Sequence, residues 1–209
     1  MAAVVTVAQQ KGGAGKTTLV AQLAVALAAA GLRVAALDID PQATLGAWAE
    51  LRRRRAEALP LTIEASQGWK SSLAIESLAR NHDVVLVDSP PHAETEARVV
   101  IRAATLVLVP CQPSLLDIWA SAATLNLAAH EKRPPVVVWN RLPPRGRIVD
   151  EARAALAARG DAALEAGLGN RSAFAHSLHQ GAGVVETEPR SRAAAEARAL
   201  AAAIRARLR

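Results

Sequence analysis

The chain contains 209 residues, of which 51% are apolar and 2% aromatic, and its 25 Lys and Arg against 19 Asp and Glu give a net charge of +6. This length fits one domain with a buried core, so we expect a single domain over residues 1–209. No apolar run reaches the ~18 residues that a spanning helix needs. The single cysteine, Cys111, excludes an internal disulfide and a cysteine-rich metal site.

Short β-rich runs alternate with alanine-rich helical segments along the chain. Strands are expected at 4–8, 33–37, 61–64, 83–87, 105–109 and 135–139, with a shorter seventh at 162–165. Helices are expected at 17–30, 45–56, 71–81, 94–103, 114–130, 148–159, 172–180 and 191–207. The continuous apolar strands and the β-α order predict a doubly wound, mainly parallel α/β sheet flanked by helices. Such folds bind ligands at the carboxyl ends of the strands.

A glycine-rich segment follows the first predicted strand and precedes the first predicted helix. It reads Lys11-Gly12-Gly13-Ala14-Gly15-Lys16-Thr17-Thr18. The glycines allow the backbone N–H groups to curl around a polyphosphate, and the helix N-terminus adds a positive potential. Lys16 supplies a cation for the β- and γ-phosphates, and Thr17 supplies a hydroxyl for Mg²⁺. The segment therefore predicts a phosphate-binding loop.

The loop departs from the common G-x-x-x-x-G-K-[ST] pattern, because Gln10 replaces the first glycine and Lys11 adds a second lysine. The pattern K-G-G-x-G-K-T-T resembles the deviant Walker A box of the ParA/MinD family of P-loop ATPases. The resemblance implies that ATP and Mg²⁺ are bound by residues of the loop. It also implies that Lys16 serves the nucleotide of its own subunit, whereas Lys11 reaches across a homodimer interface to the partner's phosphates.

Two further segments place carboxylates at strand ends. Asp38 and Asp40 lie in the sequence D-I-D-P-Q after the second predicted strand, and Asp88 ends the apolar run of the fourth before S-P-P. They resemble switch I and the Walker B–switch II region of ParA-type ATPases. The resemblance implies that Asp40 positions the attacking water, that Asp38 assists at the metal, and that Asp88 holds Mg²⁺. For the first segment an aspartate-rich turn is the alternative, and His92 is expected in a solvated loop.

The nucleotide base requires a separate pocket. An Asn amide offers a donor and an acceptor to adenine, and ParA-like proteins place an Asn where Asn140 ends the sixth predicted strand. The next residue, Arg141, could equally stack on the base or face solvent. The segment C-Q-P-S resembles the loop that closes the fifth strand in relatives, which implies that Pro113 lies at the nucleotide.

Three functions are compared for this fold: a metabolic or electron-transfer enzyme, a MinD-like membrane-cycling ATPase, and a DNA-binding ATPase that positions a cargo. Iron–sulfur relatives need paired cysteines, tyrosine kinases of this fold carry tyrosine clusters, and dethiobiotin-synthetase-like enzymes lack the lysine matched by Lys11; this chain has one cysteine and no tyrosine. A MinD-like membrane cycle would need an amphipathic C-terminal helix. Leu200, Ile204 and Leu208 share one helical face, but alanine dominates that face, so packing on the core is expected instead.

Binding to DNA has positive support in the charge of the C-terminal segment. From Arg171 to the end, seven arginines stand against three glutamates, a local balance of +4 (7 − 3). Phosphate contacts need only charge at suitable spacing, and Arg171, Arg190 and Arg192 are favoured because they begin helices or lie in loops. A bias of the whole chain towards Arg and Ala could also produce this charge. The arginine run 52–55 is equally well explained as a solvated helix face.

The resemblance is to small ParA proteins, which partition plasmids or chromosomes or position protein clusters such as chemoreceptors. It implies a slow ATPase that dimerises with ATP, binds nucleoid DNA without sequence preference, and is stimulated by a ParB-like or cargo-adaptor protein. We expect a cytoplasmic, nucleoid-associated protein with no stable membrane insertion. Because the first strand begins at once, we expect no leader peptide.

Overall fold

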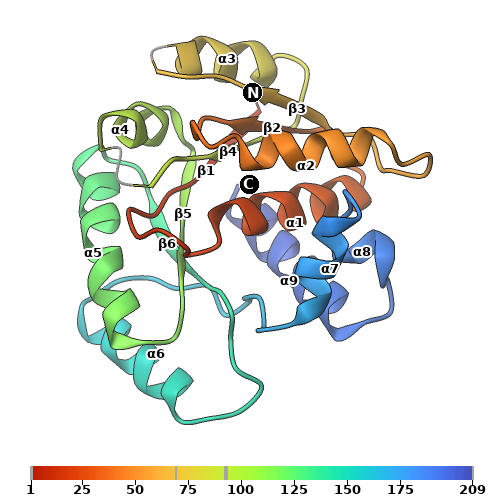
Figure 1. Cartoon of the computed structure of the whole chain (residues 1–209). Coiled ribbons are helices and arrows are strands. Elements are labelled where there is room, and N and C mark those ends of the chain that lie inside the picture. The colour runs from red at the N-terminus through yellow and green to blue at the C-terminus, as the bar shows by residue number, and fades with distance from the viewer. Residues whose placement is uncertain (1, 69, 92–93, 209) are drawn as a thin grey trace.

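The computed structural model describes residues 2–68, 70–91 and 94–208, apart from the side chain at position 94. Within them, parallel strands form a sheet of order β3-β2-β4-β1-β5-β6 (Figure 1). The strands are β1 (Ala3–Val7), β2 (Val34–Asp38), β3 (Thr62–Ala65), β4 (Val84–Asp88), β5 (Leu106–Cys111) and β6 (Pro135–Trp139). The helices are α1 (Lys16–Ala29), α2 (Thr44–Arg53), α3 (Lys70–Ala79), α4 (Glu94–Ala103), α5 (Leu115–His130), α6 (Ile148–Ala158), α7 (Ser172–His179), α8 (Val184–Thr187) and α9 (Arg192–Arg207). The doubly wound parallel α/β fold is thereby confirmed.

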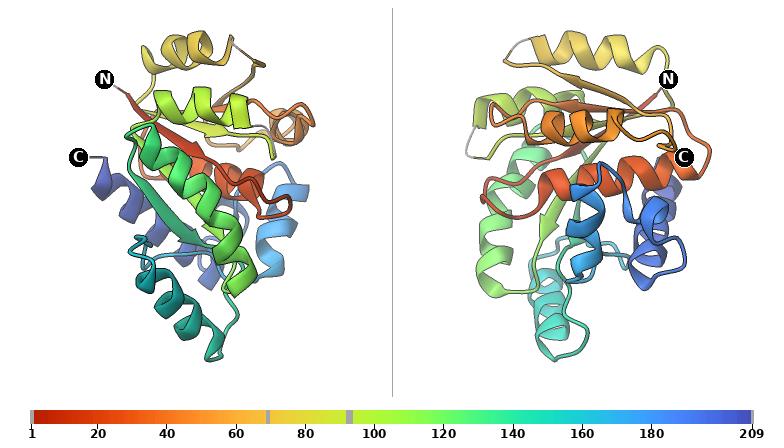
Figure 2. Two further views of the ribbon diagram at one scale, coloured as in Figure 1. Left: turned by 90° about the vertical axis from the view of Figure 1, so that its left-hand side faces the viewer. Right: turned by 45° about the vertical axis from the view of Figure 1, so that its right-hand side comes forward.

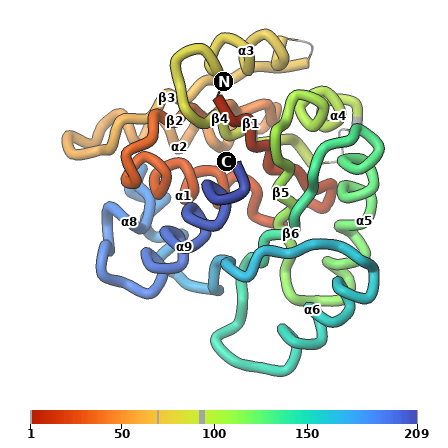
Figure 3. Tube along the Cα trace, turned by 180° about the vertical axis from the view of Figure 1, so that it is seen from behind, coloured from red at the N-terminus to blue at the C-terminus, as the bar shows by residue number. Residues whose placement is uncertain are grey.

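Helices cover both faces of the sheet, because successive strand residues point to opposite sides. In β4, Val84 and Leu86 belong to the core shared with α1, α2 and α7–α9, whereas Val85 and Val87 pack with α3 and α4. A third cluster joins β5 and β6 to α5 and α6. Figure 2 shows α4 and α5 in front of the strands in its first view, and Figure 3 shows α9 on the other side of the sheet, against α1.

The C-terminal helix α9 packs on the core as expected. Leu200 and Ile204 are buried, and Leu208 is half-buried against the same cluster. The apolar face of α9 is therefore used within the domain. No helix among residues 2–68, 70–91 and 94–208 has the length and apolar character that crossing a membrane requires.

The structure differs from the expected elements at two places. The segment 162–165 makes only an isolated bridge, in which Ala163 pairs with Val137 of β6. The N–H of Val137 donates to the carbonyl oxygen of Ala162, and the N–H of Leu164 donates to that of Val137, so the segment runs parallel beside β6 but pairs with it at one position. A few residues later Gly167 comes so close to β6 that a Cβ there would lie 2.6 Å from the carbonyl oxygen of Trp139. The one-turn helix α8 was missed, because four residues are too few to show helical periodicity.

Candidate functional site

The site lies at the carboxyl edge of the central strands, where the loop after β1 leads into α1. Gly13 and Gly15 have φ values of 73° and 87°, the left-handed region that favours glycine. At Gly15 there is a second constraint, because a Cβ would lie 2.4 Å from Nδ2 of Asn140. The glycines thus allow both the curl of the loop and its close approach to the end of β6. Gly12 and Gly13 are exposed, whereas Ala14 is buried.

The two lysines of the loop face different surroundings. Lys16 is 7% exposed, and its ammonium donates to the carbonyl oxygen of Gln9 at 3.1 Å. Burial lowers the pKa of Lys16, while the nearby carboxylates of Asp88 and Asp40 oppose this shift. The side chain of Lys11, by contrast, is 40% exposed and forms an ion pair with a residue of α5. The structure therefore places one lysine inside the phosphate-binding loop and the other outside it.

The outer lysine is held by an acidic residue that the sequence analysis did not single out. Nζ of Lys11 lies 2.9 Å from Oδ1 of Asp117, in the first turn of α5. The other carboxylate oxygen of Asp117 accepts from the hydroxyl of Ser114 at 2.6 Å, and Ser114 in turn caps α5 by accepting from the N–H of Asp117. The Ser-x-x-Asp spacing is a recognisable helix start, but its contact with Lys11 is tertiary.

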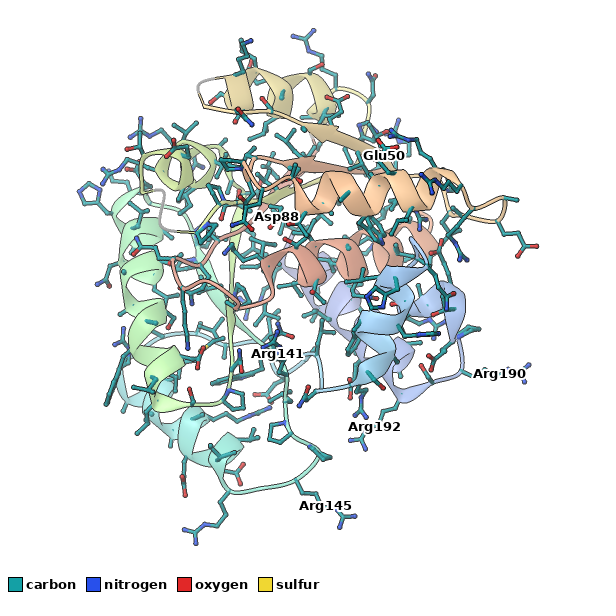
Figure 4. All side chains as sticks on the ribbon, in the orientation of Figure 1. Glu50, Asp88, Arg141, Arg145, Arg190 and Arg192 are labelled. Carbon is teal, nitrogen blue, oxygen red and sulfur yellow. The ribbon has the colours of Figure 1, made fainter. Side chains whose placement is uncertain are left out.

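Asp88 presents a buried carboxylate with unused oxygens. It is 1% exposed at the end of β4, in the interior of the molecule (Figure 4). Burial raises its pKa to about 7. The Thr17 hydroxyl and the Lys16 ammonium oppose this rise, although neither carboxylate oxygen has a hydrogen bond of good geometry among the described residues. Leaving such a group unpaired is costly, and a bound cation would satisfy it.

This environment fits Mg²⁺ bound together with a nucleotide. Mg²⁺ is usually held by one or two carboxylates, waters and phosphates of the substrate, and Asp88 and the Thr17 hydroxyl are ligands of that kind. Within residues 2–68, 70–91 and 94–208, no three Asp, Glu, His or Cys side chains converge as they would around a metal held by protein alone. The donor set therefore fits a metal that arrives with its phosphates.

Asp38 and Asp40 lie beside Asp88, because β2 and β4 are in a register that pairs residue 38 with residue 88. The carboxylate of Asp38 accepts from the N–H groups of Asp40 and Gly46, each at 3.0 Å. Burial nevertheless raises the pKa of Asp38. Ala43, at the N-cap position of α2, has no side-chain acceptor, so Asp38 caps this helix from the strand end. Asp40 accepts from the N–H of Gln42 at 2.9 Å.

A cavity of about 570 Å³ opens beside the loop on the α7 side. Its lining includes Gly15, Thr18, Asn140, Arg141 and Phe174. The Asn140 amide donates to the carbonyl oxygen of Ala14 at 2.9 Å and accepts from the N–H of Arg141 at 3.0 Å. Asn140 thus holds the loop in place through Ala14, a contact that could not be predicted from the sequence. Its contact with adenine stays a prediction. Figure 4 shows Arg141 beneath the loop in this view.

Pro113 lies in the turn between β5 and α5, one residue before the cap Ser114. It is buried, and it is not part of the lining that the described residues give to the cavity. Cys111, at the end of β5, is also buried, and burial raises the pKa of its thiol to about 12. His92 lies outside the described residues.

The three arginines predicted to contact DNA differ in their surroundings. Arg171 lines the cavity, and its guanidinium forms two hydrogen bonds to Glu196, at 2.6 and 2.9 Å. Arg190 and Arg192 are exposed and project from the body of the molecule (Figure 4). Nε of Arg192 lies 3.7 Å from the carboxylate of Glu196. The two outer arginines are therefore accessible to a phosphate backbone, whereas Arg171 already has a partner.

The run 52–55 is not a uniformly solvated face. Arg52 is buried, and both its terminal nitrogens donate to the carboxylate of Glu186 at 2.9 and 2.8 Å. The same guanidinium also donates to the carbonyl oxygens of Gly181 and Leu59. This pair ties the end of α2 to α8, whereas Arg53 and Arg54 remain exposed.

Comparisons with known proteins bear on the family and the fold of the chain. A profile of the CobQ/CobB/MinD/ParA nucleotide binding domain matches residues 5–184. Maintenance of carboxysome distribution protein A (McdA) from Halothiobacillus neapolitanus is 29% identical, over 91% of this chain and 90% of that protein. The fold is similar to that of a Cyanothece McdA variant in complex with ATP (TM-score 0.76, 18% identity, 98% of this chain and 96% of that one). It is also similar to MinD from Pyrococcus horikoshii with Mg-ADP (TM-score 0.77, 20% identity, 98% and 96%).

Proposed function

Because the chain belongs to the CobQ/CobB/MinD/ParA family of nucleotide-binding domains, we propose that it is a ParA-like ATPase whose ATP-bound homodimer binds DNA and partitions or positions a cargo. The cargo would be a plasmid, a chromosome or a protein cluster. A carboxysome-distribution protein among its relatives supports the last of these. Release would follow hydrolysis, which is slow until a ParB-like or cargo-adaptor protein stimulates it.

The observation that carries this proposal is the separation of the two loop lysines. Lys16 is turned into the loop, where its ammonium can meet the phosphates of the nucleotide bound to the same subunit. Lys11 instead reaches Asp117 of α5, and its side chain is 40% exposed. A second lysine that does not face the nucleotide of its own subunit can bind the phosphates of a nucleotide held by another subunit. Two subunits that close face to face would then each supply Lys11 to the other.

The residues of the site divide the chemistry among them. Asp88 and the Thr17 hydroxyl would hold Mg²⁺, with Asp38 assisting; when bound, the ion neutralises charge on the phosphates. Asp40 orients the attacking water, and Lys11 of the facing subunit offsets charge that develops on the transferred phosphoryl group. Asn140 fixes the loop against the end of β6 and presents its remaining amide groups to adenine.

The DNA-binding surface would include Arg190 and Arg192, which are exposed beside the start of α9. A chain with a net charge of +6 attracts a polyanion, and dimerisation doubles that charge. Contacts of this kind are independent of sequence and weaken steeply with salt. They would place the protein on the nucleoid in the cytoplasm.

The deciding experiment is co-sedimentation with random-sequence duplex DNA in ATP, ADP or no nucleotide, at about 50 and 200 mM salt. Binding that requires ATP and falls strongly with salt supports the proposal. If the protein dimerises with ATP but binds no DNA, liposome binding then tests a MinD-like membrane cycle. The burial of Leu200 and Ile204 disfavours such a cycle, because the apolar face of α9 is already occupied.

A further inference from the structure

The first two turns of α5 carry an apolar surface that the domain does not cover. Leu115, Leu116 and Trp119 are 51%, 69% and 61% exposed, and they are half of the large apolar side chains that are exposed among the described residues. The others, Leu51, Leu73 and Ile148, lie on three different helices. A cluster of this kind, with an exposed tryptophan, is typical of a surface that binds another protein.

The three side chains form one continuous face. At 100° per residue, Leu115 and Trp119 stack one turn apart, and Leu116 lies beside them. Between them in the sequence, Asp117 and Ile118 turn into the domain and are buried. The apolar face is therefore the outer side of a helix whose inner side is already packed on the domain.

This face lies close to Lys11, because the same helix, α5, carries the ion-pair partner of Lys11. Asp117, which binds Lys11 at 2.9 Å, lies in the same turn as Leu115 and Leu116. Figure 1 shows α5 starting at the carboxyl edge of the sheet, where the loop between β1 and α1 also lies. Lys has a stem of only four carbons, so a subunit that takes Lys11 to its own phosphates must approach this turn closely.

We propose that Leu115, Leu116 and Trp119, here called the α5 face, pack against a second copy of this chain in the ATP-bound dimer. The inference rests on the proposed function, which requires a second copy at this edge. A two-fold dimer uses the same surface on both subunits, so the α5 face contributes six apolar side chains. Two of the six are tryptophans, and an aromatic side chain buries about 150–250 Å². With the four leucines they can form the apolar centre of a standard interface of about 1,600 Å², not its whole area. Apolar contact would also offset the repulsion between two chains that each carry +6.

Sedimentation velocity of the full chain with ATP and Mg²⁺ tests this proposal in wild type, Leu116→Ser and Trp119→Ser. Leu73→Ser is the matched control, because Leu73 is 57% exposed on α3. Nucleotide binding by the monomer is measured in parallel. We expect each α5 variant to bind ATP normally and to dimerise roughly 10- to 30-fold more weakly than wild type, as for an interface hot spot. The control should dimerise like wild type.

The outcomes separate this inference from the proposed function. If wild type dimerises with ATP and both α5 variants do so equally well, the α5 face does not bind a second copy, while the ATP-driven dimer stands. If wild type does not dimerise with ATP, both fall. Dimers that form normally but no longer respond to a stimulating protein would assign the face to that protein and overturn the inference.

Discussion

Lys11 and Asp117 form an ion pair of 2.9 Å that joins the phosphate-binding loop to α5. Asp117 also accepts a hydrogen bond from the hydroxyl of Ser114, which fixes the orientation of its carboxylate independently of Lys11. If Lys11 serves the nucleotide of a second subunit, this pair must open when the dimer forms. Asp117 then competes with the partner's phosphates for Lys11.

Replacing Asp117 with Asn should therefore strengthen ATP-dependent dimerisation. Because Lys11 is 40% exposed, the pair contributes at most about 1 kcal/mol in each subunit. Two pairs open when one dimer forms, so the dissociation constant of the dimer should fall by up to roughly 30-fold. Sedimentation equilibrium with ATP measures the change, and Ser114→Ala, which loosens the carboxylate without removing its charge, should give a smaller one. Weaker dimerisation of Asp117→Asn would mean that Asp117 orients Lys11 for its partner.

Substitutions of the two lysines should separate binding from dimerisation. Lys16→Ala removes the buried ammonium of the loop and should abolish detectable nucleotide binding. Lys11→Ala should leave binding of ATP by the monomer within about threefold of wild type, while dimerisation and hydrolysis are lost. Calorimetry and sedimentation measure these two properties. Dimers of Lys11→Ala with ATP would refute the crossed-lysine arrangement.

Asp40→Ala should trap the ATP state. Without a carboxylate to orient the water, hydrolysis should fall by about 10²-fold or more, while the dimer persists on DNA. Phosphate release and the lifetime of the DNA complex are the measurements. Normal hydrolysis by this variant would remove Asp40 from the catalytic step. Gln42→Ala is a control, because Gln42 is exposed and bonds Asp40 through its backbone N–H, which the substitution keeps.

Stability in the absence of nucleotide should depend on Asp88. Its pKa is raised by burial to about 7, against 3.8 in the unfolded chain, so the folded state holds the proton more strongly. The free energy of unfolding should then fall as the pH rises from about 4 to 7 and level off above. Asp38, whose pKa is also raised, acts in the same direction.

Asp88→Asn should remove the part of this slope that comes from Asp88. The variant should be more stable than wild type at pH 8, by an amount on the order of 1–3 kcal/mol, and the difference should vanish near pH 4. Urea unfolding at the two pH values measures it. The same variant should bind ATP with Mg²⁺ more weakly. An equal difference at both pH values would exclude the titration of Asp88 as its cause.

The buried pair of Arg52 and Glu186 should be important for stability. Burial alone would raise the pKa of Glu186, but hydrogen bonds from Arg52 and from the backbone of Leu59 and Gly183 lower it instead. Arg52→Ala leaves this carboxylate buried without its partner and should cost about 3–5 kcal/mol. Arg54→Ala, at an exposed neighbouring position, should cost less than about 0.5 kcal/mol. Urea unfolding of both variants provides the comparison.

The parts of this molecule that were predictable from sequence are those set by local patterns. Apolar strands that end in Asp38 and Asp88 predict both the parallel sheet and the meeting of these residues, because the carboxyl ends of parallel strands share one edge. The glycine-rich loop likewise depends on a contiguous segment. A local sequence pattern predicts the structure well where the conformation does not depend on contacts with residues far away in the sequence.

The remaining features depend on residues far apart in the sequence. Asp117 meets Lys11 across 106 positions, and Arg52 meets Glu186 across 134. Asp38 resembles a metal ligand in its motif, yet in the fold it also caps α2, because Ala43 cannot. Nothing local distinguishes a buried arginine from the three that follow it, so the run 52–55 reads as one solvated face.

The two ends of α2 are anchored to different parts of the molecule. Near its start, the N–H of Gly46 is bound to the carboxylate of Asp38, and near its end Arg52 is bound to Glu186 of α8. Ten residues of helix span about 15 Å, and a helix transmits displacement along its axis with little bending. A movement of Asp38 would therefore shift α2 as a rigid body. Through Arg52 and Glu186 the shift would reach α8 and the segment that leads to Arg190 and Arg192.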